Sequence, residues 1–307
     1  MIDSSDKNRA TILGLAAIVL WSVTVGLARS LSERVGPLAG GAGVYLAAGA
    51  LCRLRQGGRG SGGLPARYIF GCGSLFVLYL LSFYLAIGLS ADRAEVLGVG
   101  LANYLWPSLT ILFSLALLGK TAGPLIIPGS LLALGGVLLA MSDGAGVSIS
   151  EMLAGAARRP GVHLLAAFGA VLWALYSNLT ARWMGGRSES AVGSFMMTTG
   201  AALLGLAVLG LGPGGGGSFF GSWTPAAAGE ALALGLATAA GYECWEASMR
   251  KGDVALVAAA SYFTPLLSTI FSCLYLGVRP GTGLWAGCGL VVAGSLLSWR
   301  AVSDGRS

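Results

Sequence analysis

The chain alternates between long apolar runs and short breaks that are charged or rich in glycine and proline. A helix that crosses the ~30 Å hydrocarbon core of a bilayer needs about 20 mostly apolar residues. The pattern predicts ten such helices, over residues 10–28, 38–54, 68–89, 94–118, 125–141, 162–183, 190–211, 226–249, 254–276 and 284–299. Because the runs are continuous rather than alternating in hydrophobicity, they favour helices over the strands of a membrane barrel.

The composition agrees with this pattern. Hydrophobic residues make up 55% of the chain, charged residues only 10%, and the mean hydropathy is +0.77. Soluble domains carry about 25% charged residues, so this chain is too poor in charge to form an ordinary water-facing surface. The 50 glycines are expected at close contacts between membrane helices. The predicted fold class is an all-α membrane protein.

The basic residues predict the orientation of the helices. If the N-terminus is cytoplasmic, 13 of the 19 Lys and Arg residues fall in cytoplasmic segments and the other six on the outer side. Positive charge gathers on the cytoplasmic side of membrane proteins, so both termini should lie inside a bacterial inner membrane. The net charge of +6 is therefore interpreted as a topology signal that favours lipid headgroups, with no nucleic-acid partner expected.

Two parts of the sequence resemble each other. Sliding the chain by 158 residues aligns the fourth predicted helix with the ninth and pairs Tyr104 with Tyr262 and Pro107 with Pro265. A shift of 152 aligns the Leu-Trp of the first helix with that of the sixth. Apolar helices often look alike by chance, but matched proline, tyrosine and tryptophan residues favour a true repeat.

The glycines of the fifth and tenth helices match under the same shift of 158, which pairs Gly129 with Gly287 and Gly136 with Gly294. We therefore predict two repeats, residues 1–143 and 162–307, joined by an outer connector over 144–161. Each repeat contains five spans. Since five is odd, the second repeat must be inverted in the membrane, an arrangement that transporters use to open a midplane site to either side in turn.

The two prolines mark a candidate site. A proline within a helix displaces the carbonyl four residues earlier, which here belongs to Asn103 and to Ser261. Such carbonyls are costly in lipid and should face a hydrated cavity or protein. Pro107 and Pro265 are candidate hinges, and Asn103 and Ser261 are candidate polar contacts for an ammonium group. The alternative is an ordinary kink repaired by hydroxyl groups of the same helix.

Aromatic residues gather at the same predicted depth, too far inside the spans to belong to interfacial belts. Rings would suit an apolar or aromatic side chain of a ligand, although for any one ring packing between helices is an equal alternative. The candidate substrate-binding residues are Trp21, Tyr79, Phe83, Asn103, Tyr104, Trp106, Trp173, Tyr176, Ser261 and Tyr262.

The eighth span carries two acids, Glu243 and Glu246. An acid within a span is a functional hypothesis by default, and both are candidates for proton coupling or gating. Glu246 lies one helical turn before Arg250, a spacing that also suits a simple ion pair at the interface. Glu243 is expected to lie a turn deeper and is the stronger candidate.

Catalytic groups are scarce. His163 is the only histidine, and the five cysteines form no CxxC pair, so we predict no catalytic residues, no metal site and no cofactor. A membrane enzyme or a receptor without transport activity is the alternative from another class. It is disfavoured because few groups remain for catalysis.

Several of these motifs resemble a known group. The Leu-Trp of the first helix in each half, the Tyr-x-x-Pro-Leu-Leu-Ser run at 262–268 and the glycine-rich fifth and tenth helices resemble the drug/metabolite transporter superfamily, of the EamA type. The runs that begin at Asn103 and Gly241 are most similar to bacterial aromatic amino-acid exporters. The resemblance implies ten helices around a central cavity walled mainly by helices 1, 3, 4, 6, 8 and 9.

The resemblance and the residues together predict a secondary exporter of neutral, preferably aromatic, amino acids that works by alternating access. An exporter of cationic drugs or other small metabolites is the alternative of the same class and would require an acid deep in the cavity. The expected partners are the amino-acid substrate and the lipid bilayer. The oligomeric state is open, and a monomer is compatible with the sequence.

Overall fold

The computed structural model describes residues 4–55, 63–210, 223–276 and 281–304. Within these ranges the chain is nearly all helical. The elements in chain order are α1 (Ser4–Val35), α2 (Pro37–Arg55), the π-helical turn η1 (Arg67–Cys72), α3 (Gly73–Leu89), α4 (Arg93–Asn103), α5 (Trp106–Leu118), β1 (Lys120–Ala122), α6 (Ile126–Ala145), α7 (Ile149–Arg158), α8 (Pro160–Met184), α9 (Val192–Val208), α10 (Pro225–Lys251), α11 (Val254–Ala260), α12 (Phe263–Leu276), α13 (Thr282–Ala301) and β2 (Val302–Asp304).

Each predicted apolar run falls mainly on helix. The third run forms η1 and α3 in succession, and two other runs are divided by a turn. The fourth run forms α4 and α5, and the ninth forms α11 and α12. Residue 211, the predicted end of the seventh run, lies outside the described residues. In the described part of the chain, six helices are long and apolar enough to cross a membrane, and two further apolar helical stretches are shorter. The protein is an all-α, multi-pass membrane protein.

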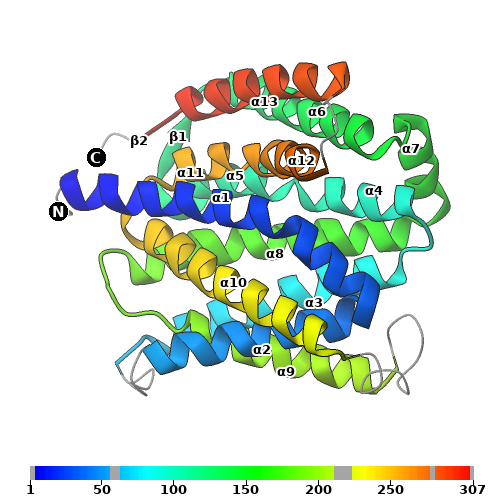
Figure 1. Ribbon diagram of the computed structural model, residues 1–307. Helices are drawn as coiled ribbons and strands as arrows, with labels where there is room; N and C mark the ends of the chain where they lie inside the picture. The colour runs from blue at the N-terminus through cyan, green and yellow to red at the C-terminus, as the bar shows by residue number, and fades with distance from the viewer. Residues whose placement is uncertain (1–3, 56–62, 211–222, 277–280, 305–307) are drawn as a thin grey trace.

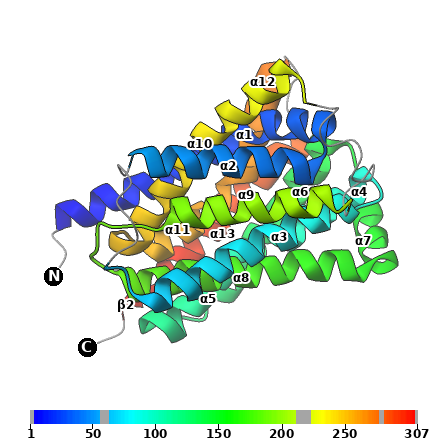
Figure 2. The same ribbon diagram turned by 90° about the horizontal axis from the view of Figure 1, so that it is seen from below.

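The helices are arranged in layers (Figures 1 and 2). The pair α6 and α13 forms one edge of the bundle, and the pair α2 and α9 forms the opposite edge. Between them lie α1, α8, α3, α10 and the two divided helices. Both ends of the chain lie on the same side of the bundle (Figure 1). We call this side the end nearest the termini, and the opposite side the end away from the termini.

Glycines allow the edge pairs to approach closely. At Gly136 an added Cβ atom would lie 2.7 Å from the carbonyl oxygen of Gly287, and at Gly287 it would lie 2.7 Å from the carbonyl oxygen of Gly136. Gly129 and Gly294 contact each other's backbones in the same reciprocal way. Small residues at such crossings are how membrane helices gain van der Waals contact without a hydrophobic driving force.

The connector over 144–161 contains a helix that the apolar pattern does not predict. Helix α7 begins with a capping box in which Ser148 accepts a hydrogen bond from the backbone N–H of Glu151, and Glu151 accepts one from the backbone N–H of Ser148. The short strands β1 and β2 were also not predicted. They pair in antiparallel register and join the end of the α5 segment to the C-terminal end of α13.

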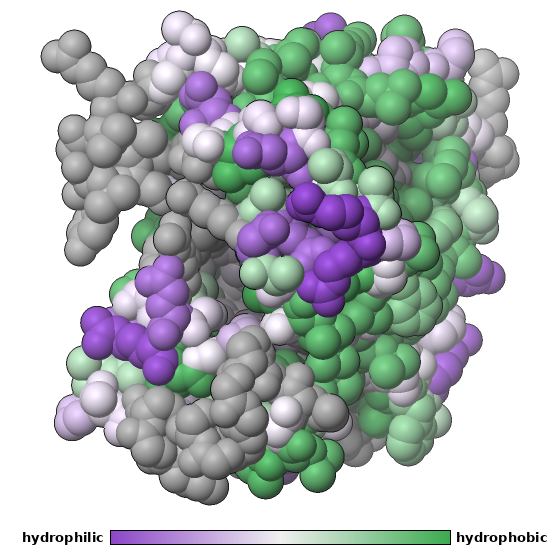
Figure 3. All heavy atoms as spheres, turned by 90° about the vertical axis from the view of Figure 1, so that its right-hand side faces the viewer, coloured by the Kyte–Doolittle hydropathy of each residue, from purple (hydrophilic) through white to green (hydrophobic). Residues whose placement is uncertain are grey.

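The outside of the bundle is apolar. Leu131, Leu164 and Ile127 are each more than 60% exposed, and so is the ring of Phe70. In water, patches of this kind would drive aggregation, whereas in a bilayer they face the acyl chains. Figure 3 shows such hydrophobic surface along the flank of the molecule. It also shows hydrophilic side chains gathered around a hollow at the end that faces away from the termini.

Candidate functional site

A cavity of about 300 Å³ lies inside the bundle. It is bordered by the C-terminal halves of α1 and α3, the N-terminal half of α2, and the region where α4 ends and α5 begins, with contributions from α8, α10 and α12. These helix halves belong to the end of the molecule away from the termini (Figure 1). A volume of this size matches the lower range of small-molecule pockets.

Seven of the ten candidate substrate-binding residues line this cavity: Trp21, Tyr79, Phe83, Asn103, Tyr104, Trp106 and Trp173. Sequence reasoning missed further polar lining residues: Thr24, Tyr45, Tyr84, Thr238, Tyr242 and Thr264. Among the lining residues that the structure describes, none is Asp, Glu, Lys, Arg or His. The wall therefore consists of rings, small residues and neutral hydrogen-bonding groups.

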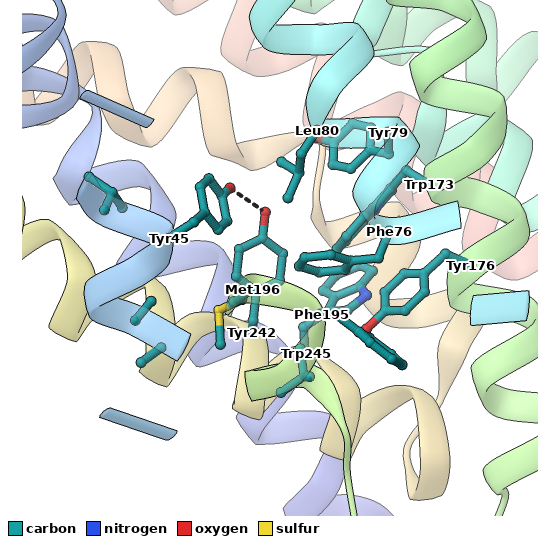
Figure 4. Close-up of a cluster of buried hydrophobic side chains, with 14 of the residues drawn as sticks. Tyr45, Phe76, Tyr79, Leu80, Trp173, Tyr176, Phe195, Met196, Tyr242 and Trp245 are labelled. Carbon is teal, nitrogen blue, oxygen red and sulfur yellow. Dashed lines mark hydrogen bonds between the residues drawn. The ribbon is translucent and has the colours of Figure 1, made fainter. Parts of the chain in front are cut away.

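Trp173 belongs to a cluster of buried rings (Figure 4) and lines the cavity. We call the part of the lining formed by Trp173, Tyr79, Trp106 and Trp21 the bottom of the cavity. The ring centroid of Trp173 is 5.0 Å from that of Tyr79, 6.0 Å from that of Trp106 and 6.1 Å from that of Trp21. Trp245, which is completely buried, packs 5.5 Å from Trp173 on the side away from the cavity lining. These tilted and edge-on contacts are the favourable geometries for aromatic pairs and hold the lining rings in place.

Three unpaired polar atoms belong to residues that line the cavity. Asn103 Oδ1, Trp173 Nε1 and Thr264 Oγ1 are buried without a hydrogen-bond partner. Buried polar groups without partners are costly, and these atoms have almost no accessible surface, so they would gain a partner from a ligand only after a rearrangement of their side chains. The hydroxyls of Tyr45 and Tyr242, by contrast, hydrogen-bond to each other at 3.0 Å (Figure 4).

The prolines stand at helix beginnings rather than at kinks within helices. Helix α4 ends at Asn103 and α5 begins at Trp106, which places Pro107 in the first turn of α5, where a missing N–H is tolerated. Pro265 likewise lies in the first turn of α12. The Ser108 and Tyr262 hydroxyls hydrogen-bond across the two breaks.

The carbonyl expected to be free at Ser261 is not free. It accepts a hydrogen bond from the backbone N–H of Thr264 at 3.0 Å, and the Ser261 hydroxyl donates to the carbonyl of Val257. Because the chain turns tightly there, the hydrogen bond lost at Pro265 is replaced locally. Ser261 and Tyr262 are both fully buried and do not line the cavity, which corrects their expected placement.

Tyr176 also lies off the cavity, in a polar cluster beneath the rings. We call this the Glu246 cluster, consisting of Tyr68, Tyr176, Ser190, Glu246 and Arg250. The Glu246 carboxylate accepts hydrogen bonds from the hydroxyls of Tyr68 at 2.7 Å and Tyr176 at 2.8 Å, from Arg250 at 2.6 Å and from the Ser190 hydroxyl. Glu246 is 0% exposed and Arg250 is 7% exposed.

Glu243 is the less buried of the two acids: its side chain is 32% exposed and forms an ion pair with Arg55 at 3.2 Å. Its position one turn deeper in the membrane stays a prediction. The prediction that Glu246 pairs with Arg250 is confirmed, but the pair is buried inside the protein rather than placed at a solvated interface. Neither acid lines the cavity.

Apolar helices around an internal cavity, with helix breaks beside it, are a common architecture of secondary transporters. Comparison with known proteins defines the class further. Residues 161–300 match the EamA-like transporter family. The aromatic amino acid exporter YddG of Salmonella typhimurium (strain 14028s / SGSC 2262) is 36% identical in an alignment 312 positions long, which covers 96% of this chain and 98% of that protein.

The exporter of the same name from Escherichia coli (strain K12) is 35% identical, and the alignment covers 97% of this chain and 99% of that protein. A third exporter of this name is 32% identical, and its alignment covers 95% of this chain and 97% of that protein; it comes from Ancylobacter novellus (strain ATCC 8093 / DSM 506 / JCM 20403 / CCM 1077 / IAM 12100 / NBRC 12443 / NCIMB 10456). A crystal structure of a protein 29% identical to this chain superposes with a TM-score of 0.75 and covers 95% of this chain and 97% of that one.

The chain therefore belongs to the EamA-like transporter family. The expected family is confirmed, and with it the prediction that the protein is a transporter rather than an enzyme.

Proposed function

We propose that this protein exports neutral amino acids, preferably aromatic ones, across a bacterial inner membrane, and that the ring-walled cavity is the substrate site. The observation that carries the proposal is the chemistry of the wall. Rings of Trp21, Trp106 and Trp173 suit an apolar or aromatic side chain. The unpaired Asn103 Oδ1 and Thr264 Oγ1 suit an ammonium group, and the unpaired Trp173 N–H suits a carboxylate.

The absence of full charges from the described part of the wall favours a zwitterion over a cation. A cationic drug would leave its charge without a counter-ion in a low-dielectric site, which is costly. The names of the relatives, aromatic amino acid exporters, favour the same cargo.

We further propose ten spans in two inverted five-span repeats, with both termini in the cytoplasm. Four spans beyond the six long apolar helices are then α1, α9, α10 and the pair α11–α12. Helix contacts support the repeat: α1 packs on α10 as α8 packs on α3, and α1 packs on α12 as α8 packs on α5. The connector over 144–161 lies outside, between the repeats.

With this orientation the cavity occupies the outer half of the membrane, and the ring layer and the Glu246 cluster separate it from the cytoplasm. Alternating access then requires a second state in which the cytoplasmic half opens and the outer half closes. The helix breaks beside Pro107 and Pro265 are suitable hinges because backbone rotation there breaks few hydrogen bonds.

Counterflow of labelled phenylalanine into reconstituted vesicles tests the cargo. Trp106→Ala should lower the initial rate about tenfold, because it removes a ring contact with the substrate that is worth roughly 0.5–1.5 kcal/mol beyond its buried area and with that area reaches the ~1.4 kcal/mol of a tenfold change. Trp285→Ala is the control, since Trp285 is 60% exposed on the lipid-facing side. Unchanged counterflow in Trp106→Ala, with normal insertion, would remove the ring-walled site.

The same vesicles separate the alternatives. A neutral aromatic amino acid in excess should compete with the label, and a quaternary ammonium compound should not. Competition by the quaternary ammonium alone would support the cationic-drug alternative, and counterflow with and without a pH gradient identifies proton coupling.

A further inference from the structure

We propose that Glu246 is a positioning residue that keeps the end of the molecule nearest the termini closed beneath the cavity. The Glu246 cluster must come apart before the cavity opens to that side. The proposal rests on the proposed function, which makes this end cytoplasmic and its opening a step of transport.

The cluster joins four separate parts of the chain. Tyr68 comes from η1, Tyr176 from α8, Ser190 from the segment before α9, and Glu246 and Arg250 from α10. All four parts meet at one carboxylate. Removing that carboxylate therefore removes the acceptor that these four parts share.

Backbone hydrogen bonds extend the same connection. The N–H of Ala191 donates to the Tyr68 hydroxyl at 3.1 Å, and the N–H of Gly186 donates to the carbonyl of Arg250 at 2.9 Å. The segment between α8 and α9 is thus attached to the cluster from both sides. An opening of this end has to move that segment and break these bonds together.

The cluster is also connected to the bottom of the cavity. The ring of Tyr176 packs 5.2 Å from Trp173 and 5.3 Å from Phe76, while its hydroxyl reaches Glu246. Trp245, the neighbour of Glu246 in the chain, supports Trp173 at 5.5 Å. Separation of the cluster therefore displaces the rings on which the substrate would rest.

Burial makes the cluster sensitive to the loss of one charge. A buried ion pair contributes little on balance, but removal of one partner leaves an unpaired buried charge. In Glu246→Gln the Arg250 guanidinium, 7% exposed, would lose its carboxylate, and its Nε already has no partner. Water reaches that charge only if this end opens. The substitution should therefore favour the open state over the closed one.

The predicted repeat gives the Glu246–Arg250 pair no counterpart at the outer end, where the buried Glu95 instead pairs with Arg159 of the connector at 3.0 Å. Under the shift of 158, Glu246 corresponds to Gly88 and Arg250 to Asp92. Gly88 carries no side chain, and Asp92 is occupied as the N-cap of α4. The outer end thus lacks the equivalent ion pair, and it is the end toward which the cavity lies.

Labelling of Cys72 tests the proposal. Cys72 lies in η1, one turn after Tyr68, and is 0% exposed. Inside-out vesicles containing the full chain are treated with a membrane-impermeant maleimide, and modification of each cysteine is followed by peptide mass spectrometry. We expect Glu246→Gln to raise the labelling rate of Cys72 at least tenfold over the wild type.

Glu230→Gln is the matched control, because Glu230 lies at the other end of the same helix and bonds to Ser30 at 3.1 Å. It should leave Cys72 labelling unchanged. The double variant Glu246→Gln/Arg250→Met, which removes the unpaired charge, should be labelled several-fold more slowly than Glu246→Gln alone.

Three results would overturn the proposal: wild-type labelling of Cys72 in Glu246→Gln, an equal rise at Cys288 in α13, which indicates general unfolding, or a double variant labelled as fast as the single one. The labelling needs no cargo. Failure of the proposed amino-acid export would appear in the counterflow assay and leave the labelling result standing, and the converse also holds.

Discussion

Replacement of Gly136 by alanine tests the crossing of α6 and α13 and, through it, the packing of the two proposed repeats on each other. The new Cβ atom would lie 2.7 Å from the carbonyl oxygen of Gly287 and 2.8 Å from the backbone nitrogen of Val291. Ordinary contacts of this kind begin at 3.4 Å. The two helices must therefore separate by several tenths of an ångström along their closest contact.

The neighbouring Gly135 offers a matched control, because a Cβ atom there meets nothing within 4 Å. Its repeat counterpart under the shift of 158 is already alanine, Ala293. Gly135→Ala should gain up to ~1 kcal/mol of helix propensity. Gly136→Ala has the same gain but is overpacked at a cost of roughly 1–3 kcal/mol and loses close Cα–H···O contacts of about 0.5–1 kcal/mol each.

The free energies of unfolding of the two alanine variants should then differ by about 2–4 kcal/mol, with Gly136→Ala the less stable. Equilibrium unfolding in mixed micelles with a rising fraction of denaturing detergent, followed by tryptophan fluorescence, measures the difference. Gly294→Ala, the repeat counterpart, should lose as much as Gly136→Ala, because its Cβ atom meets the backbone of Gly129 at 2.5 Å. Equal stability of Gly135→Ala and Gly136→Ala would refute the reasoning.

Two further predictions follow from single contacts. Gly241→Ala should slow phenylalanine counterflow while Gly229→Ala should not, because a Cβ atom at 241 would lie 2.6 Å from Trp21 Nε1 and push that ring into the cavity, whereas at 229 it meets nothing within 4 Å. Hydrogen bonds from the backbone N–H of Ser148, and then from its hydroxyl, lower the pKa of Glu151 in the folded protein. The capping box therefore stabilises α7 at a pH above the unfolded pKa of about 4.3. This stabilisation is lost as the pH falls through the lower folded pKa. Amide exchange in α7 should therefore show less protection in acid than at neutral pH after correction for the intrinsic rate, and Glu151→Gln should abolish that pH effect.

The sequence predicted how far along a span a residue lies better than it predicted which side of the helix the residue is on. Trp21, Trp106 and Trp173 are central in the apolar runs, and all three line the cavity. Tyr45 lies at a comparable position in its own run but carries no accompanying proline or repeat match. Helices that are apolar all round give no moment that identifies the inward face, so Tyr45 could not be distinguished from residues that face lipid. Tyr84, by contrast, pairs with Tyr242 under the shift of 158, and both line the cavity, so the repeat offered a signal for these two residues.

Helix α7 had a readable signal outside the apolar pattern. Ser148-Ile-Ser-Glu151 is a capping-box sequence, and Met152, which is 2% exposed, packs inward one turn into the helix. A search restricted to long apolar runs passes over such a short amphipathic segment. The pairing of β1 with β2 had no local signal, because its two strands are about 180 residues apart and three residues long.

Glu243 and Glu246 show the same limit at the level of the site. Three residues along a helix advance it by only ~4.5 Å but rotate it by about 300°, so two acids of similar depth face different neighbours. Glu243 reaches Arg55, 188 residues away, while Glu246 reaches Tyr68 and Tyr176 from two other elements. Burial, unlike depth, depends on the partners around the helix, so the sequence could not show that Glu246 is the more enclosed of the two acids.

Equivalent residues of the two predicted repeats also differ in their surroundings. Asn103 and Tyr104 line the cavity, whereas their counterparts Ser261 and Tyr262 are completely buried beside it. When a site between two inverted repeats is open to one side only, the two repeats have different conformations. Equivalent positions in the two proposed repeats can therefore have different surroundings in any one state. Under the proposed mechanism, the structural difference between Asn103 and Ser261 reflects the state of the molecule rather than a failure of the repeat.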